Sequence, residues 1–100
     1  MIIEKTEFNG LFLIKPIVHQ DKRGYFFESF RDDYLKKIDL SGKFCQDNQT
    51  QSKKGTLRGL HYQLEYPQGK LVRVSLGEVY DVAVDVRKNS PTFGKYYGAI

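Results

Sequence analysis

The sequence predicts an all-β domain, a sandwich or barrel of short strands. Runs of β-branched and aromatic residues recur between turn residues, and Phe and Tyr together make up 14% of the chain. These runs follow one another at regular spacing, which is typical of a sandwich or a barrel. Only one segment has the charge layout of a helix. A chain of 100 residues holds one domain at most, so residues 1–100 are expected to belong to a single domain.

The first part of the chain predicts three strands and one helix. The strands are expected at residues 2–7, 11–16 and 25–30. A turn at 21–24 precedes the third strand, since Gly24 tolerates a positive φ. The helix is expected at residues 31–40, because two aspartates lie at its start and two lysines near its end, where each complements the helix dipole.

The second part of the chain predicts only strands. They are expected at residues 44–51, 56–64, 71–77, 79–86 and 95–100, with turns at 52–55 and 89–92. In the segment 79–86, valines alternate with Asp81, Ala83 and Asp85, which predicts one apolar and one polar face. The chain stops inside an apolar strand pattern. We therefore expect an incomplete sheet whose last edge lacks a neighbour.

Charge and cysteine content limit the classes of function. The chain has 16 basic and 12 acidic side chains, a net charge of +4, which favours an anionic ligand but is not the dense basic stripe of a nucleic-acid binder. Cys45 is the only cysteine, which excludes an internal disulfide and favours a reducing compartment. No apolar run approaches a membrane span, and the N-terminus lacks a signal-peptide layout. We expect a cytoplasmic protein that binds neither membrane nor nucleic acid.

The segment Arg58-Gly59-Leu60-His61 carries the clearest chemical signal. A histidine held beside cations can act as a general base on an anionic substrate, because the cations stabilise the negative charge that develops. Strict alternation would place Arg58 and His61 on opposite faces, so a bulge or a strand entry near Gly59 must redirect one of them. The alternative is a purely structural histidine.

Other polar residues are weaker candidates, each with a structural alternative. Lys70 opens a strand after a Pro/Gly loop and could stabilise an enolate or a phosphate, or simply face solvent. The polar run at 46–49 could line a sugar or base site, or form an edge facing water. Arg23 and Glu28 read by themselves as surface charges. Asp81 or Asp85 could orient His61, in the way that a triad carboxylate orients its imidazole, or could be a surface carboxylate.

Seven motifs, in order along the chain, together resemble the dTDP-4-dehydrorhamnose 3,5-epimerase family. They are Leu11-Phe12-Leu13-Ile14-Lys15-Pro16, Asp21-Lys22-Arg23-Gly24-Tyr25-Phe26-Phe27-Glu28, Gln46-Asp47-Asn48, Gly55-Thr56-Leu57-Arg58-Gly59-Leu60-His61-Tyr62-Gln63, Gly69-Lys70-Leu71-Val72-Arg73-Val74, Gly77-Glu78-Val79-Tyr80-Asp81-Val82-Ala83-Val84-Asp85-Val86-Arg87 and Ser90-Pro91-Thr92-Phe93-Gly94.

The resemblance implies a cupin-type jelly roll, of which residues 1–100 are the N-terminal part, and a homodimer. It implies proton removal and return at C3 and C5 of a dTDP-linked 4-keto-6-deoxy sugar, in dTDP-L-rhamnose biosynthesis. By position, His61 would be the base and Lys70 the stabiliser of the enolate oxygen. The substrate would be held by Arg23, Phe26, Glu28, Gln46, Asn48 and Arg58, with Phe26 packing on the base ring.

No metal or other cofactor is expected. The chain has two histidines, far apart, and a transition-metal site needs three or four good ligands. At two positions where many metal cupins place ligands, this chain has Gln63 and Lys70. Two alternatives stay open: a 3-epimerase, 5-epimerase or ketoisomerase on the same sugar nucleotide, and a cupin fragment that binds the sugar nucleotide without catalysis.

Overall fold

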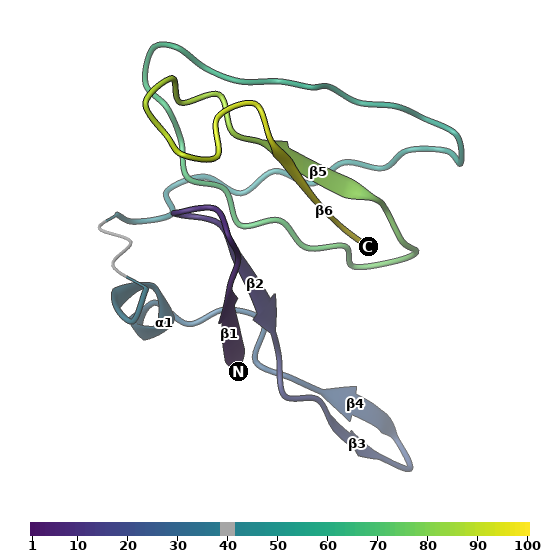
Figure 1. Cartoon of the computed structure of the whole chain (residues 1–100). Helices are drawn as coiled ribbons and strands as arrows, with labels where there is room; N and C mark the ends of the chain where they lie inside the picture. Colours follow the sequence, from purple (N-terminus) through teal and green to yellow (C-terminus); the bar gives the residue numbers. More distant parts are fainter. Residues whose placement is uncertain (39–41) are drawn as a thin grey trace. The chain divides into compact units, whose positions relative to one another are not determined.

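The computed structural model describes residues 1–38 and 42–100, and the chain divides into two compact units. We call residues 1–42 with 78–100 the hairpin unit, and residues 43–77 the loop unit. The elements in chain order are β1 (Ile2–Lys5), β2 (Phe12–Lys15), β3 (His19–Asp21), β4 (Gly24–Phe26), α1 (Asp33–Lys36), β5 (Asp81–Val84) and β6 (Tyr96–Ala99) (Figure 1). All of them belong to the hairpin unit. The expectation of an all-β chain with one short helix is confirmed.

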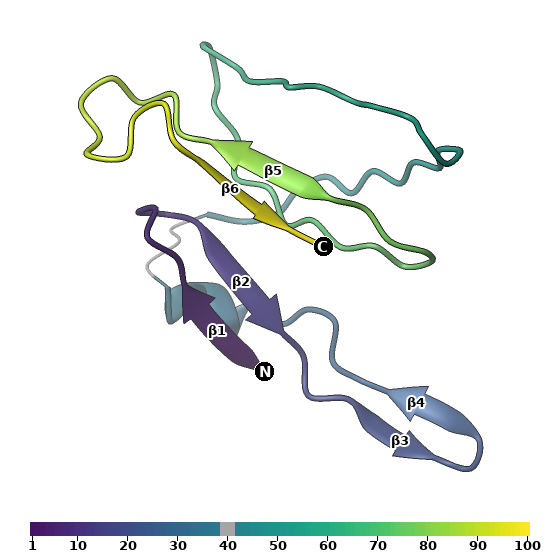
Figure 2. The ribbon, with the colours of Figure 1, turned by 45° about the vertical axis from the view of Figure 1, so that its right-hand side comes forward.

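The strands form three antiparallel pairs, each between neighbours in sequence (Figure 2). In β1–β2, Ile3 lies opposite Ile14, and in β5–β6, Val82 lies opposite Gly98. The strands expected at 2–7, 11–16, 79–86 and 95–100 are therefore present in shortened form. β3 was not expected, and β4 covers only the start of the strand expected at 25–30. The turn expected at 21–24 lies in the β3–β4 hairpin, where Gly24 has a φ of 138°.

The helix is shorter than the charge pattern predicts. α1 covers Asp33–Lys36, a single turn, and the Asp32 side chain makes no capping hydrogen bond. The expected start at Arg31 is wrong: Arg31 precedes the helix, and its side chain forms an ion pair with Asp33, the first residue of α1. The last two expected helical residues, Asp39 and Leu40, lie outside the described residues. One apolar side chain of α1, Leu35, is buried, and this burial is what anchors so short a helix.

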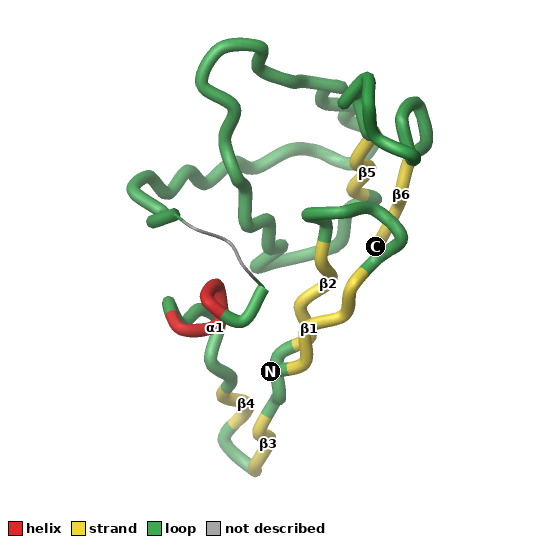
Figure 3. The backbone as a smooth tube through the Cα atoms, turned by 60° about the vertical axis from the view of Figure 1, so that its left-hand side comes forward, coloured by secondary structure: helices red, strands yellow, loops and turns green. Residues whose placement is uncertain are grey.

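The loop unit contains no strand, which corrects the strands expected at 44–51, 56–64 and 71–77 (Figure 3). The expected turn at 52–55 is present: the Thr56 N–H donates to the Lys53 carbonyl at 3.2 Å. The alternating side-chain pattern suits a strand, but a strand also needs a neighbour to bond with its backbone. The segments of the loop unit do not pair with one another, so the pattern alone does not produce a sheet.

The buried apolar side chains of the described residues are few. Phe8, at the β1–β2 turn, and Leu35 of α1 are the large ones below a tenth exposed. The Phe8 ring meets that of Tyr97 edge to face at 6.3 Å between centroids, which joins the β1–β2 turn to β6. The Arg87 guanidinium donates to the Asn9 carbonyl at 2.9 Å and joins the same turn to the loop after β5. These contacts hold the β1–β2 and β5–β6 hairpins together.

Candidate functional site

The residues predicted to bind or transform the substrate divide between the two units. The hairpin unit carries Arg23, Phe26, Glu28 and Asp81, and the loop unit carries Gln46, Asn48, Arg58, His61 and Lys70. Within each unit the local geometry shows which of these side chains share a surface and which are already held by protein neighbours.

The β3–β4 hairpin presents Arg23 and Phe26 together. Both line a shallow cavity of about 440 Å³ formed by the hairpin. Asp21 holds Arg23 in place: its carboxylate accepts from the Arg23 backbone N–H at 2.8 Å and from Nη2 at 2.7 Å. These hydrogen bonds lower the pKa of Asp21. The predicted binding residue Arg23 therefore lies at the tip of the hairpin, and hydrogen bonds to Asp21 fix both its backbone and its guanidinium.

Phe26 is 70% exposed, which is unusual for a phenylalanine. It is paired across the hairpin with His19, and the two rings stack at 6.5 Å between centroids and 30° between planes. An exposed aromatic ring supported from one side is suited to packing against another flat ring. This geometry is compatible with the predicted packing of Phe26 on a nucleotide base.

Glu28 follows the hairpin and is held by two side chains. Its carboxylate accepts from Arg31 Nη1 at 3.2 Å and from the Tyr34 hydroxyl at 3.1 Å. Arg31 also donates to both oxygens of Asp33, and its guanidinium lies 4.4 Å from the centroid of the Tyr34 ring. Glu28 is thus the predicted binding residue with the most closely defined side-chain surroundings.

Asp81 and Asp85, the two candidates to orient His61, differ in their surroundings. Asp81 lies on β5 opposite Ala99 and is exposed. Asp85 is buried, and its carboxylate accepts from Arg87, from Ser90 Oγ at 2.5 Å and from Thr92 Oγ1 at 2.6 Å. These hydrogen bonds hold the pKa of Asp85 far below its usual range. Both Asp85 oxygens accept hydrogen bonds from residues of its own loop. Asp81 is therefore the remaining candidate to orient His61.

In the loop unit, the predicted polar binders are exposed and partly ordered by one another. The Gln46 amide donates to Asn48 Oδ1 at 3.2 Å, so two of the predicted binding amides lie together. The Arg58 guanidinium donates to Ser52 Oγ at 2.8 Å and reaches the Gln51 carbonyl at 3.5 Å. These contacts order the side chains without burying them.

His61 is exposed, and within the loop unit its side chain makes no hydrogen bond or ion pair. The backbone before it turns at Gly59, whose φ of 98° is rarely adopted by residues with a Cβ. A Cβ at Gly59 would lie 3.3 Å from the His61 backbone nitrogen and 3.5 Å from its Nδ1. The predicted bulge or strand entry near Gly59 is not formed, because this segment is not a strand; the backbone instead turns at Gly59, where an added Cβ would crowd His61.

Lys70 is also exposed, and within the loop unit its ammonium has no hydrogen bond or ion pair. Such a group remains able to approach an anion. Nothing in the loop unit brings Lys70 and His61 into contact, so their joint action stays a prediction.

Two further findings concern ligands and membranes. Among residues 1–38 and 42–100, no group of three or more His, Cys, Asp or Glu side chains is arranged to hold a metal ion. In the same part of the chain, no helix is long and apolar enough to cross a bilayer.

Sequence reasoning missed two side-chain clusters. It did not connect Glu28 to Arg31 and Tyr34. These two residues lie only three and six positions later in the chain, just before α1 and in its first turn. It also did not identify the Asp85 cluster, although Ser and Thr five and seven residues after an aspartate are suited to closing a loop around its carboxylate.

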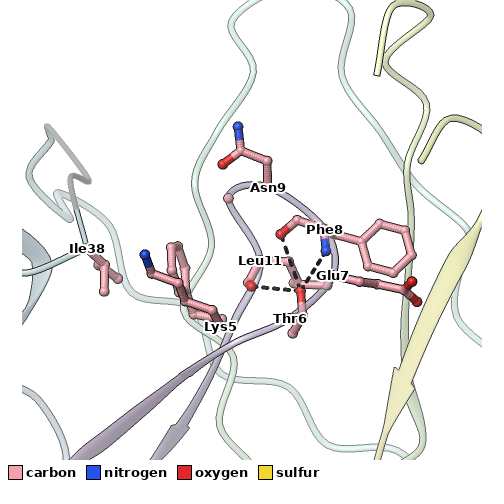
Figure 4. A pocket seen from close by; sticks show the side chains of 9 residues that line it. Lys5, Thr6, Glu7, Phe8, Asn9, Leu11 and Ile38 are labelled. Atoms are coloured by element: carbon pink, nitrogen blue, oxygen red, sulfur yellow. Dashed lines mark hydrogen bonds between the residues drawn. The ribbon is translucent and has the colours of Figure 1, made fainter. Parts of the chain in front are cut away.

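A second cavity, of about 370 Å³, lies at the β1–β2 turn and is lined by residues 5–12 and Ile38 (Figure 4). The Thr6 hydroxyl closes this turn: it donates to the Leu11 carbonyl at 2.9 Å and accepts from the Phe8 N–H at 3.1 Å (Figure 4). None of the predicted site residues lines this cavity.

Comparison with known proteins gives consistent results. The family model described as dTDP-4-dehydrorhamnose 3,5-epimerase matches residues 5–100. The dTDP-4-dehydrorhamnose 3,5-epimerase of Methanothermobacter thermautotrophicus is 52% identical over 94 residues, which is 94% of this chain and 51% of that protein. The enzyme of the same name from Shigella flexneri is 53% identical over 100 residues, which is 98% of this chain and 55% of that protein.

Solved structures agree with the sequence comparisons. The crystal structure of dTDP-6-deoxy-D-glucose-3,5-epimerase from Legionella pneumophila, in complex with dTDP-4-keto-L-rhamnose, matches with a TM-score of 0.92 and 48% identity. The match covers 98% of this chain and 53% of that chain. The structure of dTDP-4-dehydrorhamnose 3,5-epimerase from Elizabethkingia anophelis matches with a TM-score of 0.88 and 44% identity.

This chain spans about half the length of the curated relatives that it matches. The all-β cupin-type fold expected from the motifs is confirmed as a partial one by the agreement with these structures. A model match over residues 5–100 and identities near 50% over nearly the whole chain lead to one conclusion: the chain belongs to the dTDP-4-dehydrorhamnose 3,5-epimerase family.

Proposed function

We propose that this protein acts as a dTDP-4-dehydrorhamnose 3,5-epimerase, converting dTDP-4-keto-6-deoxy-D-glucose to dTDP-4-keto-L-rhamnose. The observation that carries the proposal is the agreement, at 48% identity and a TM-score of 0.92, with an epimerase structure that contains dTDP-4-keto-L-rhamnose. Exposed cations and amides in both units are the groups that a sugar diphosphate requires.

The chemistry follows from the ketone at C4. It makes the hydrogens on C3 and C5 acidic, since the electron pair left by the departing proton is delocalised onto the ketone oxygen. The neutral imidazole of His61 accepts the proton, and Lys70 stabilises the enolate oxygen that results. For inversion, an acid other than His61 then protonates the carbon on its opposite face, while the proton held by His61 passes to solvent. No metal or redox cofactor is required for these steps.

Arg23, Arg58 and the amides of Gln46 and Asn48 hold the nucleotide diphosphate and sugar. Phe26 packs on the base ring, and Glu28 accepts a hydrogen bond from the substrate. Asp81 orients the His61 imidazole. These side chains are exposed, apart from the half-buried Glu28, and their exposure supports access to ligand.

Removal of His61 tests the proposed base. His61→Ala is expected to slow deuterium exchange at C3 and C5 by on the order of 10²–10⁴-fold, because the general base is lost. Added imidazole should restore part of the rate, which a merely misfolded variant would not show. Undiminished exchange by His61→Ala would remove His61 from the mechanism.

The role of Lys70 has a matched control in Lys54, an exposed lysine in the same unit. Lys70→Met is expected to lower the exchange rate at saturating substrate by roughly 10²-fold or more, as for other groups that stabilise developing charge. Lys54→Met should leave the rate unchanged. Equal rates for the two variants would contradict the assignment.

The stereochemical outcome separates the proposal from its nearest alternative. Exchange at both C3 and C5 supports a 3,5-epimerase, whereas exchange at one carbon supports a 3-epimerase, a 5-epimerase or a ketoisomerase, which the configuration of the product and the position of its ketone distinguish. Binding of the sugar nucleotide without exchange would identify a protein that binds and does not catalyse. The fact that this chain spans about half the length of its curated relatives gives this last outcome a specific basis.

We also propose that the protein forms a homodimer. One chain has a mass of 11.6 kDa, and light scattering on a purified sample is expected to give twice that value. A mass of one chain at all concentrations would contradict it.

A further inference from the structure

The carboxylate of Glu28 is held on one side by two donors from the start of α1. Oε2 accepts from the Tyr34 hydroxyl at 3.1 Å, and Oε1 accepts from Arg31 Nη1 at 3.2 Å. Each carboxylate oxygen has two lone pairs, so further accepting positions remain. The Glu28 side chain is 39% exposed, which leaves those positions open to a ligand.

Arg31 is itself fixed by several neighbours. It donates to both oxygens of Asp33, at 2.5 and 3.0 Å, and its guanidinium lies 4.4 Å from the Tyr34 ring centroid. A planar guanidinium held in this way keeps its charge and direction. Arg31 and Tyr34 therefore form a small rigid support for a single carboxylate.

The Arg31 cation reduces the repulsion between the Glu28 carboxylate and an anionic ligand. A nucleoside diphosphate is anionic, and an isolated carboxylate near it would repel it. The Arg31 cation beside Glu28 offsets this repulsion at short range. A carboxylate compensated in this way can still accept a hydrogen bond from an uncharged hydroxyl or ring N–H.

We propose that Arg31 and Tyr34 are positioning residues that hold the Glu28 carboxylate to accept a hydrogen bond from an uncharged donor in the nucleotide portion of the substrate. This inference rests on the proposed function. The nucleotide portion is indicated because Glu28 lies two residues after Phe26, whose exposed ring is placed to pack on a base.

The first test removes one oxygen atom. Tyr34→Phe keeps the ring beneath Arg31 and loses the hydroxyl that Glu28 accepts from. Its dissociation constant for dTDP, measured by calorimetry, is expected to rise about 3- to 10-fold, the range for one hydrogen bond. The exchange rate at saturating sugar nucleotide should stay unchanged, while KM rises. Tyr97→Phe is the matched control, since Tyr97 is also half-buried and its ring packs on Phe8.

A double-mutant cycle shows whether the effect passes through Glu28. In a Glu28→Ala background, Tyr34→Phe is expected to have no further effect on dTDP binding. Arg31→Gln should weaken dTDP binding in the native background and lose its effect with Glu28→Ala. If Arg31 instead contacts the diphosphate directly, its effect persists in that background and the proposal is wrong.

The outcomes separate this inference from the proposed function. Native protein that binds no dTDP would contradict the proposed function, and the inference with it. Native protein that binds dTDP, with Tyr34→Phe and Arg31→Gln both indistinguishable from it, would overturn the positioning role alone. Arg31→Gln keeps the test decisive even if Tyr34→Phe fails to fold.

Discussion

Asp85 shows how much one buried carboxylate can organise. It accepts from the Arg87 guanidinium and from two hydroxyls, and it is 7% exposed. The loop between β5 and β6 closes around it, and Arg87 continues to the Asn9 carbonyl. Asp85 therefore links its own loop to the β1–β2 turn through Arg87.

Asp85→Asn is expected to lower Tm by about 4–8 °C, the range for the loss of one strong interaction in a domain of this size. Asn has one accepting oxygen and replaces the other with a donating NH₂ group, so some donors of the loop lose their acceptor. Calorimetry against Asp47→Asn, an exposed aspartate, provides the comparison. An equal Tm for both variants would contradict the anchoring role.

The same carboxylate predicts a pH dependence of stability. The folded-state pKa of Asp85 lies below its unfolded value, because Arg87, Ser90 and Thr92 donate to it. The stabilisation is therefore complete above the unfolded pKa of about 3.9 and declines as pH falls below it. Thermal melts from pH 6 to pH 3 should show the native protein losing Tm faster than Asp85→Asn. Parallel curves would be the contrary result.

Gly59 tests whether the backbone places His61. Gly59→Ala adds a Cβ 3.3 Å from the His61 backbone nitrogen, at a φ of 98°. Gly55→Ala carries a comparable backbone penalty, with a φ of 86°, but its Cβ meets nothing within 4 Å. Gly59→Ala is expected to slow deuterium exchange by roughly 10-fold or more relative to Gly55→Ala, since a misplacement of about 1 Å can cost about 10²-fold. Similar exchange rates for Gly59→Ala and Gly55→Ala would argue that the backbone at Gly59 does not place His61.

At the scale of elements, sequence patterns succeeded where the partner strand is near in the chain. β1 with β2 and β5 with β6 are both hairpins, so alternation and turn residues together contain most of the information that defines them. The strands expected in the loop unit failed for the opposite reason. Their alternation is equally clear, but it does not specify a neighbour.

The candidate site was predictable to a similar extent. A turn of the backbone at Gly59 is permitted by the sequence, because a glycine stands between Arg58 and His61, but the strand expected around it is absent. The partners of Glu28 and Asp85 did not follow, because hydrogen bonds between side chains depend on where a short helix or loop begins. The start of α1 at Asp33, and not at Arg31, is such a detail.

Gly98 in β6 offers a test of how tightly the β5–β6 hairpin is packed. The Tyr80 ring and hydroxyl occupy the space that a Cβ at Gly98 would need. Gly98→Ala is expected to destabilise the protein by about 1–3 kcal/mol through overpacking. Denaturant melts should show a loss that Tyr80→Ala partly relieves. Gly69→Ala, where a Cβ meets open space, is the control, and an equal effect there would contradict the packing argument.

At the scale of the whole molecule, burial is uneven. Phe8 and Leu35 are buried in the hairpin unit, whereas Leu57 and Leu76 in the loop unit are 90% and 91% exposed. Segments with few buried apolar contacts and few backbone hydrogen bonds open with little free energy. The two units should therefore differ in local stability.

Hydrogen exchange of backbone amides measures this difference. Amides of β1, β2, β5 and β6 are expected to exchange more slowly than those of residues 43–77, because the strand amides are hydrogen-bonded in pairs. Peptides from β3 and β4 provide an internal comparison, since that hairpin is exposed along its length. Uniform protection across the chain would contradict the expectation.

The most direct test of the central claim is proton NMR of dTDP-4-keto-6-deoxy-D-glucose in heavy water with this protein. With native protein, the C3 and C5 signals are expected to disappear faster than the buffer rate, whereas with His61→Ala they are expected to persist. A folded native sample that binds dTDP but leaves both signals intact would contradict the epimerase function.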